Sequence, residues 1–150
     1  LLAAASVSAG TFEGTEIGIS TSITSAIGGS NNDRLTGDGG ANTLDGRGGN
    51  DWLEGGGGDD FLIGGIGTDV FVFKENAGSD TIGDFTDGLD LIDLRDHVGA
   101  TDFAGLDIAQ VGADTEIRVT GPTDADTITL TGVTVTSLDA DDFIFDTFAI

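Results

Sequence analysis

An apolar residue recurs with a period of nine through the middle of the chain. These residues are Leu35, Leu44, Leu53, Leu62 and Phe71. Each stands eighth in a nine-residue block, and five such blocks run without gaps over residues 28–72. Every block begins with glycine, which tolerates positive φ and favours a tight turn. The pattern predicts a six-residue turn followed by a three-residue strand in each block, with the apolar side chains stacked in one interior ladder.

The sixth position of each block carries a side chain that ends in an oxygen ligand. The residues are Asp33, Asn42, Asp51, Asp60 and Asp69. When turns stack, these side chains lie above one another, and bare carboxylates in that arrangement repel. A hard cation between them converts the repulsion into attraction, and turn carbonyls supply the remaining oxygens. The repeats therefore predict a series of metal-binding turns.

The five blocks resemble the repeats-in-toxin (RTX) family, whose nonapeptide is G-G-x-G-x-D-x-U-x with U large and apolar. Residues 17–33 are similar to the lead-in of the C-terminal domain of serralysin-type metalloproteases, and residues 71–94 are similar to the segment after its roll. The resemblance implies an all-β fold: a right-handed parallel β-roll of nonapeptide repeats, capped by a C-terminal antiparallel β segment. It also implies Ca²⁺ as the bound metal.

The chain divides into three expected parts. Residues 1–27 form a lead-in strand segment, residues 28–72 form the roll, and residues 73–150 form a β cap that ends in a secretion signal. Within the cap, residues 106–111 and 115–119 alternate apolar and polar around a glycine turn, which predicts a hairpin. The outward positions of the last two blocks are apolar, so we expect the C-terminal strands to cover the end of the roll.

The resemblance implies that each turn binds calcium through its sixth side chain and through backbone carbonyls at positions one, two and four. The implied carbonyl donors are Gly29, Asn31, Asp38, Gly40, Gly46, Arg47, Gly49, Gly55, Gly56, Gly58, Gly64, Gly65 and Gly67. Two nonapeptides make one turn of such a roll, so alternate blocks share an edge. Three loop pairs follow, and they imply about three roll ions. A fourth ion is expected between the fourth block and the cap, with Asp80 as a ligand.

Two departures from the repeat affect these sites. Asn31 replaces glycine at position four, and asparagine is the other residue that readily adopts the left-handed conformation. Asn42 replaces aspartate at position six, which keeps an oxygen but removes a charge, so the pair formed by blocks two and four is expected to be the weakest.

Other residues have competing interpretations. The side chains of Asp38, Asp45 and Asp59 are expected in solvent because they lie off position six. His97 is expected at the surface or in the cap, and Trp52 is expected to pack partly rather than to bind a sugar. The acids after the roll fit either a fifth calcium site or a solvated face; they are Asp84, Asp87, Asp90 and Asp93.

The composition of the chain excludes several classes of function. The 150 residues carry 27 acids and 5 Lys or Arg, for a net charge of −22, which excludes nucleic-acid binding through phosphate neutralisation. There is no cysteine and no run of about 18 apolar residues, so neither a thiol site nor a membrane-spanning segment is expected. The chain contains neither H-E-x-x-H nor G-x-S-x-G, and no catalytic residue is assigned.

The sequence therefore predicts a non-catalytic, calcium-folded module at the C-terminus of a secreted, extracellular bacterial protein. The resemblance implies export by a type I secretion machinery that reads the C-terminus. Two alternatives stay open. The module is an accessory domain of a metalloprotease or polysaccharide-modifying enzyme whose catalytic domain lies upstream, or it is a calcium-dependent adhesion module.

Overall fold

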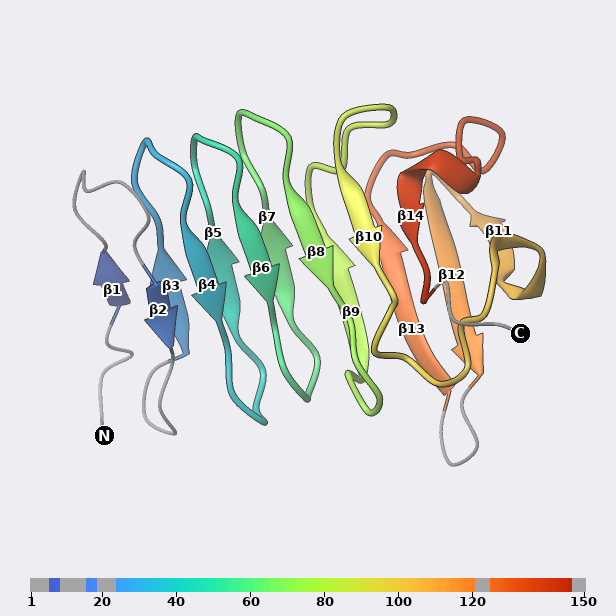
Figure 1. Cartoon of the computed structure of the whole chain (residues 1–150), viewed down its shortest axis with the longest axis horizontal. Coiled ribbons are helices and arrows are strands. Elements are labelled where there is room, and N and C mark those ends of the chain that lie inside the picture. Colours follow the sequence, from blue (N-terminus) through green and yellow to red (C-terminus); the bar gives the residue numbers. More distant parts are fainter. Residues whose placement is uncertain (1–5, 9–15, 19–23, 121–124, 147–150) are drawn as a thin grey trace.

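The computed structural model describes residues 6–8, 16–18, 24–120 and 125–146, and it shows a flattened roll of short strands (Figure 1). The strands of the lead-in and the repeats are β1 (Ser6–Ser8), β2 (Glu16–Gly18), β3 (Ser25–Ile27), β4 (Arg34–Thr36), β5 (Thr43–Asp45), β6 (Trp52–Glu54), β7 (Phe61–Ile63) and β8 (Val70–Val72). Strands β4 to β8 coincide with the three-residue strands that the period of nine predicts.

Successive strands alternate between two parallel sheets, because each six-residue turn carries the chain across to the other side. One sheet contains β1, β3, β5 and β7, and the other contains β2, β4, β6 and β8. Residues 18 apart pair in register, as Leu35 does with Leu53 and Leu53 with Phe71. The eighth-position side chains are fully buried between the sheets. The predicted interior ladder and the all-β roll are confirmed.

The remaining elements extend both sheets at the C-terminal end. They are β9 (Ser79–Ile82), β10 (Leu91–Asp93), the 3-10 turn η1 (Phe103–Gly105), β11 (Asp107–Val111), β12 (Asp114–Thr120), β13 (Ala125–Leu130), the 3-10 turn η2 (Ala140–Asp142) and β14 (Phe143–Ile144). The predicted hairpin is present as β11 and β12, and β13 joins it antiparallel. However, β13 and β14 pair parallel to β9 and β10, so the cap continues the roll instead of only closing it.

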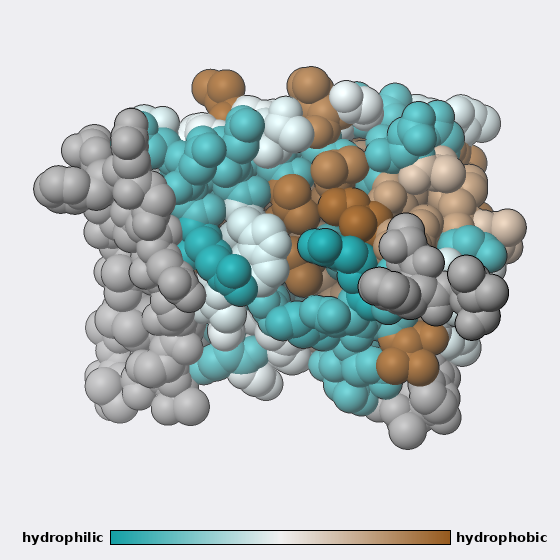
Figure 2. Space-filling model, viewed as in Figure 1, coloured by the Kyte–Doolittle hydropathy of each residue, from teal (hydrophilic) through white to brown (hydrophobic). Residues whose placement is uncertain are grey.

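The cap does not cover all of the apolar outward positions. Val72 is buried, but Phe61 remains 41 % exposed on the outer face of β7. Figure 2 shows hydrophobic surface gathered over the later part of the face seen there, while the earlier strands present mainly hydrophilic surface. The C-terminal strands cover the end of the roll, as expected, but they leave Phe61 exposed because they add to the end of each sheet and do not cross its outer face.

Two expectations fall partly outside the described residues. The lead-in resemblance includes residues 19–23, and the terminal secretion signal includes residues 147–150. Among the described residues, none of the helical elements is long and apolar enough to cross a bilayer.

Candidate metal centre

The sixth-position side chains stack along two edges of the roll. Figure 1 shows the turns along opposite edges of the two sheets. On one edge, the backbone N–H of Asp33 donates to Oδ1 of Asp51 at 2.7 Å, and the N–H of Asp51 donates to Oδ1 of Asp69 at 2.8 Å. On the other edge, the N–H of Asn42 donates to Oδ1 of Asp60 at 2.7 Å. The structure therefore brings together the same loop pairs that the repeat predicts.

Each of these aspartates is buried with one carboxylate oxygen left without a hydrogen-bond partner in the described structure. The unpartnered atoms are Oδ1 of Asp33 and Oδ2 of Asp51, Asp60 and Asp69. A buried polar atom without a partner costs about 1–3 kcal/mol, and more when it carries charge. Such atoms occur in four of the five repeat turns, and they fit oxygen ligands of a cation.

Burial also changes how these carboxyls titrate. Loss of solvation, together with the charges of the neighbouring carboxylates of Asp69 and Asp33, raises the pKa of Asp51 to about 7, against a backbone hydrogen bond from Asp33 that lowers it. Burial raises the pKa of Asp60 and of Asp69 to about 6 in the same way. The ion-free roll thus disfavours its own ionised ligands, and a bound divalent cation removes that penalty.

The backbone of the turns presents its carbonyls in stacked rows. A Cβ atom on Gly46 would lie 2.7 Å from the carbonyl oxygen of Gly64, one coil away. Gly56 and Gly65, at position two, and Gly58, at position four, all have φ near +100°. Glycine is required where these coils meet, because any side chain would collide with the carbonyl of the adjacent turn.

Two backbone details differ from the sequence expectation. Asn31 is not among the left-handed residues, so the conformation expected of it at position four is wrong. The non-glycine residues with positive φ in the described part of the chain are Arg47, at φ 73°, and Asn76, at φ 61°. Arg47 holds position two, where later blocks have glycine, so the stacking of the turns sets this conformation against the residue's own preference.

The side chains of the turns and their backbone carbonyls are both candidate ligands. In the described ranges, no group of three or more His, Cys, Asp or Glu side chains is arranged to hold a metal ion. Asn42 has a single side-chain oxygen, which already accepts the N–H of Asp38 at 2.8 Å. That bond supports the prediction that the pair of turns 37–42 and 55–60 is the weakest site.

A second ladder, at position five, was not anticipated. Oδ1 of Asn32 accepts the N–H of Asn50 at 2.8 Å, and Oδ1 of Asn50 accepts the N–H of Thr68 at 3.0 Å. Oδ1 of Asp59 accepts the N–H of Ser79 at 3.1 Å, so Asp59 has a turn-to-turn role instead of a purely solvated one. The recurrence of Asn or Asp at position five was the sequence signal for this ladder.

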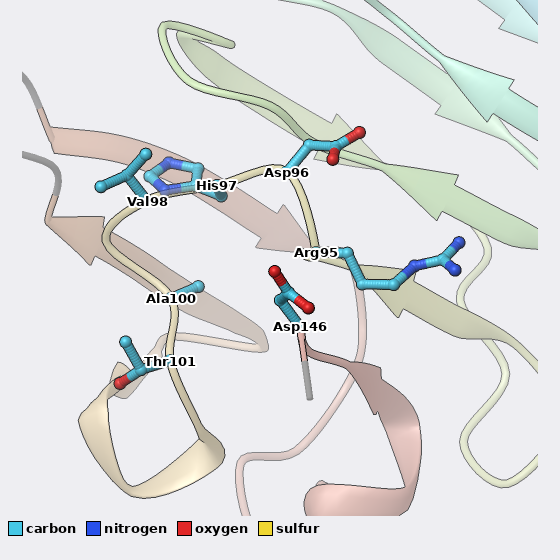
Figure 3. Close-up of a pocket in the computed structure, with 7 residues that line it drawn as sticks. All are labelled: Arg95, Asp96, His97, Val98, Ala100, Thr101 and Asp146. Carbon is cyan, nitrogen blue, oxygen red and sulfur yellow. The ribbon is translucent and has the colours of Figure 1, made fainter. Parts of the chain in front are cut away.

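His97 lies in the cap and is only 3 % exposed, so the surface alternative for it is wrong. Nδ1 accepts the N–H of Gly99 at 3.2 Å, and Nε2 lies 2.8 Å from Oδ2 of Asp126. His97 lines a pocket of about 320 Å³. Figure 3 shows Arg95 and Asp146 at one side of this pocket and Thr101 at another. Because both ring nitrogens are engaged, His97 does not offer a free base to that cavity.

Trp52 packs against a cation on the outer face of the roll. The guanidinium carbon of Arg34 lies 3.7 Å from the centroid of the Trp52 ring, in the geometry of a cation–π contact. The two residues are direct cross-strand partners on β4 and β6. This contact agrees with the expectation that Trp52 is partly packed.

Comparison with known proteins identifies the repeats. The RTX calcium-binding nonapeptide repeat, in four copies, matches residues 27–62 and 36–71. No curated protein matches the chain. Among solved structures, the AlgE6R2 subunit of the Azotobacter vinelandii mannuronan C5-epimerase matches with TM-score 0.53 and 26 % identity, over 96 % of this chain and 94 % of that one. The AlgE6R3 subunit of that epimerase matches with TM-score 0.51 and 25 % identity, over 81 % and 83 %.

The extracellular lipase LipA from Serratia marcescens also shares the fold, with TM-score 0.50 and 20 % identity. The match covers 91 % of this chain but only 20 % of the lipase, so the chain corresponds to one part of that enzyme. The nonapeptide period, the stacked turns with their unpartnered carboxylates and the family match all agree. Residues 27–71 of this chain are RTX calcium-binding nonapeptide repeats folded as a β-roll.

Proposed function

We propose that this chain is a calcium-folded C-terminal module of a type I secreted, extracellular bacterial protein and is not itself an enzyme. The observation that carries the proposal is the row of buried carboxylate oxygens without hydrogen-bond partners in successive turns. Calcium prefers six to eight oxygen ligands, a mixture that these turns can supply from carboxylates and carbonyls.

Three ions between stacked turns account for the roll. One lies between turns 28–33 and 46–51, one between turns 46–51 and 64–69, and one between turns 37–42 and 55–60. The carboxylates of Asp33, Asp51, Asp60 and Asp69, the amide oxygen of Asn42 and the carbonyls at positions one, two and four would hold them. When bound, calcium supplies the positive charge that the buried carboxylates lack.

The charge of the chain links this binding to folding. Three divalent ions offset only 6 of the 22 net negative charges. Where calcium is scarce, the uncompensated charge keeps the chain open, which suits passage through a secretion channel. Outside the cell, calcium saturates sites with Kd of order 10⁻⁴–10⁻³ M, and the binding free energy becomes folding free energy.

We assign the three parts of the chain accordingly. Residues 1–27 lead into the roll, residues 28–72 bind calcium, and residues 73–150 cap the roll and carry the secretion signal at their end. The secretion machinery is the partner of that signal. The parallel pairing of β13 on β9 and of β14 on β10 supports the capping role.

Circular dichroism of the full chain tests the proposal. In EDTA we expect little β signal, and with about 5–10 mM calcium, above the Kd range of extracellular sites, we expect a full β signal. Magnesium at the same concentration is the control, because it binds poorly to sites rich in protein carbonyls. A full β signal in EDTA would refute calcium-driven folding.

One observation favours a particular kind of parent protein. The match covers 94 % of one subunit and 83 % of another subunit of a mannuronan C5-epimerase, at 25–26 % identity. That similarity supports an accessory domain of a polysaccharide-modifying enzyme over an accessory domain of a metalloprotease. Sequencing the gene upstream of residue 1 decides between them, since a metalloprotease would show a zinc-binding H-E-x-x-H motif.

A further inference from the structure

A buried polar cluster outside the proposed calcium sites joins three separate segments of the chain. His97 lies in the loop after β10, Asp126 lies in β13, and Glu75 lies in the turn of residues 75–80, which connects β8 to β9. Nε2 of His97 is 2.8 Å from Oδ2 of Asp126, and the two side chains are only 1 % and 6 % exposed. Oδ1 of Asp126 accepts the N–H of Gly78 at 3.0 Å. The cluster therefore connects the cap to turn 75–80.

The hydrogen bonds of the cluster determine which nitrogen of His97 carries the proton. The backbone N–H of Gly99 donates to Nδ1 at 3.2 Å, so Nδ1 is the unprotonated nitrogen. The proton of the neutral ring then lies on Nε2, which donates it to Asp126. In its neutral form, His97 thus has a partner at each nitrogen.

Glu75 has a carboxylate oxygen beside this ring that lacks a partner. Oε1 of Glu75 is buried, has no hydrogen-bond partner in the described structure and lies 3.7 Å from Nδ1 of His97. Nδ1 of the neutral ring has no hydrogen to donate to it. A second proton on the ring would supply that hydrogen, and it would break the bond from Gly99, because two N–H groups would then face each other. Protonation of His97 therefore exchanges the contact with Gly99 for a contact with Glu75.

The charged groups around His97 are mostly negative. Glu75 faces Nδ1 from turn 75–80, and Asp126 faces Nε2 from β13. The other charged side chains that line the pocket beside the ring are Arg95, Asp96 and Asp146. Arg95 is paired with Asp93 at 2.6 Å, and Figure 3 shows its guanidinium directed away from the His97 ring. The carboxylates attract a second proton to the ring, and burial of the ring opposes it.

We propose that His97 is a proton-operated latch between the cap and turn 75–80. The neutral ring holds Asp126 alone, whereas the protonated ring bridges Asp126 of the cap and Glu75 of the turn. The latch goes beyond the proposed function, because none of its side chains is a calcium ligand there. Its response to pH is opposite to that of the ion sites, since protons compete with calcium for carboxylates but strengthen the latch. The latch therefore keeps the cap docked at acidic pH, where the ions bind more weakly.

The protonation of His97 can be observed directly, because the chain contains one histidine. ¹⁵N NMR of the histidine-labelled full chain in saturating calcium distinguishes the ring with a proton on Nε2 alone from the ring with a proton on both nitrogens. We expect the first form at about pH 8 and the second at about pH 5. Glu75→Gln should move the midpoint of this titration to lower pH, because an amide oxygen attracts the second proton less than a carboxylate does. Equal midpoints in Glu75→Gln and wild type overturn the latch.

Thermal unfolding in saturating calcium measures how much the latch stabilises the fold. His97→Gln keeps a donor for Asp126 but cannot take up a second proton. The Tm of the wild type minus that of His97→Gln should grow by about 2–4 °C from pH 8 to pH 5. Competition between protons and calcium lowers both Tm values alike, so it cancels in the difference. In chains that also carry Glu75→Gln the difference should stay constant. A difference that does not grow towards pH 5 in the wild-type background refutes the latch.

Asp107→Asn is the matched control for Glu75→Gln, because it removes one negative charge from an exposed residue of β11. It should leave both the NMR midpoint and the Tm difference unchanged, and an effect as large as that of Glu75→Gln would attribute the result to net charge and refute the latch. Oε1 of Glu75 accepts no hydrogen bond in the neutral form, so Glu75→Gln should fold like the wild type, which circular dichroism verifies. Neither measurement counts bound calcium, so the latch and the proposed function can fail independently.

Discussion

Replacing Asp51 by asparagine should weaken two calcium sites at once. Turn 46–51 is the middle one of three on its edge, so Asp51 lies between Asp33 and Asp69 and is bonded to the backbone or side chain of both. Asp33 is the first of the three and serves one site only. The amide oxygen of the new asparagine can still accept the N–H of Asp33, so the substitution removes charge and one ligand oxygen while the hydrogen bond remains.

The size of the effect follows from the number of sites. Two unit charges 4 Å apart interact by about 4 kcal/mol at an effective dielectric constant of 20. The substitution removes the charge of the carboxylate, and the amide oxygen of asparagine restores part of the lost interaction with the ion. A tenfold loss of affinity for each site, about 1.4 kcal/mol, is a conservative figure. Asp51→Asn then costs about 2.8 kcal/mol of calcium-dependent stability, and Asp33→Asn costs about 1.4 kcal/mol.

The sign reverses without calcium. Burial and the charges of Asp69 and Asp33 raise the pKa of Asp51 to about 7, so its ionised form destabilises the ion-free roll at neutral pH. Asparagine is neutral and removes that penalty. Asp51→Asn should therefore be at least as stable as wild type in EDTA, although it is less stable in calcium.

Urea unfolding in saturating calcium, followed by circular dichroism, measures the first effect, with Asp107→Asn as the charge-matched control. Little β signal is expected in EDTA, so the second effect is measured as the β signal in EDTA after the osmolyte TMAO has been added to every variant to favour the ion-free roll. The reasoning fails if Asp51→Asn costs no more than Asp33→Asn in calcium. It also fails if Asp51→Asn shows less β signal than wild type in EDTA with TMAO, because the side chain would then act through packing and not through the ion.

Three further predictions concern the core, a strained turn and pH. Leu53→Ala opens a cavity in the interior ladder and should lower the free energy of unfolding by about 2–5 kcal/mol, measured by urea unfolding in calcium. The control is Ile66→Ala, at an 83 % exposed position, which should change this free energy by less than about 0.5 kcal/mol. Arg47→Gly should raise the Tm. A non-glycine residue in the left-handed conformation costs about 1–2 kcal/mol, whereas the greater conformational entropy of glycine in the unfolded chain costs about 0.5–1 kcal/mol. An unchanged or lower Tm would contradict this reasoning. Burial raises the pKa of Asp51 to about 7 and of Asp80 to about 8. A raised carboxyl pKa gives stability that is present below the unfolded value near 4 and is lost as pH rises through the folded value. The β signal in EDTA with TMAO should therefore fall from pH 5 to pH 8. In saturating calcium the Tm should rise over the same range, because protons compete with the ion, and the same trend in both buffers would contradict the assignment of these ligands.

The regular part of the fold was predictable because it depends on local pattern alone. A period of nine with glycine first and an apolar residue eighth gives every strand from β4 to β8 at its observed bounds. Stacking of identical units then fixes register, since a shift would bury a polar side chain in place of Leu53. The alternation of turns between two edges follows from the same period.

The details of the candidate site were harder to predict from the sequence. The position of one turn on the next decides which carboxylate oxygen lacks a hydrogen-bond partner. The sequence alone does not give the positions of the turns relative to each other. Arg47 adopts the left-handed conformation against its own preference, while Asn31, which favours it, does not. Contacts between neighbouring coils outweigh the small differences in local conformational energy between residues.

The sequence by itself determined the repeat, its interior ladder, the edge on which each sixth-position side chain lies and the demand for a cation. Each of these follows from spacing that repeats within 18 residues. Only the tertiary structure decided where the ladder ends. The sequence already indicated Asp80 as a ligand beyond the repeats, but the structure shows that Asp80 stacks on Asp60 across a two-residue insertion. It also shows that His97 supports this turn through Asp126, which is 29 residues further along the chain. Contacts of that kind depend on how the cap strands return to the roll, and such long-range pairing is set by the packing of the whole chain and not by any local pattern.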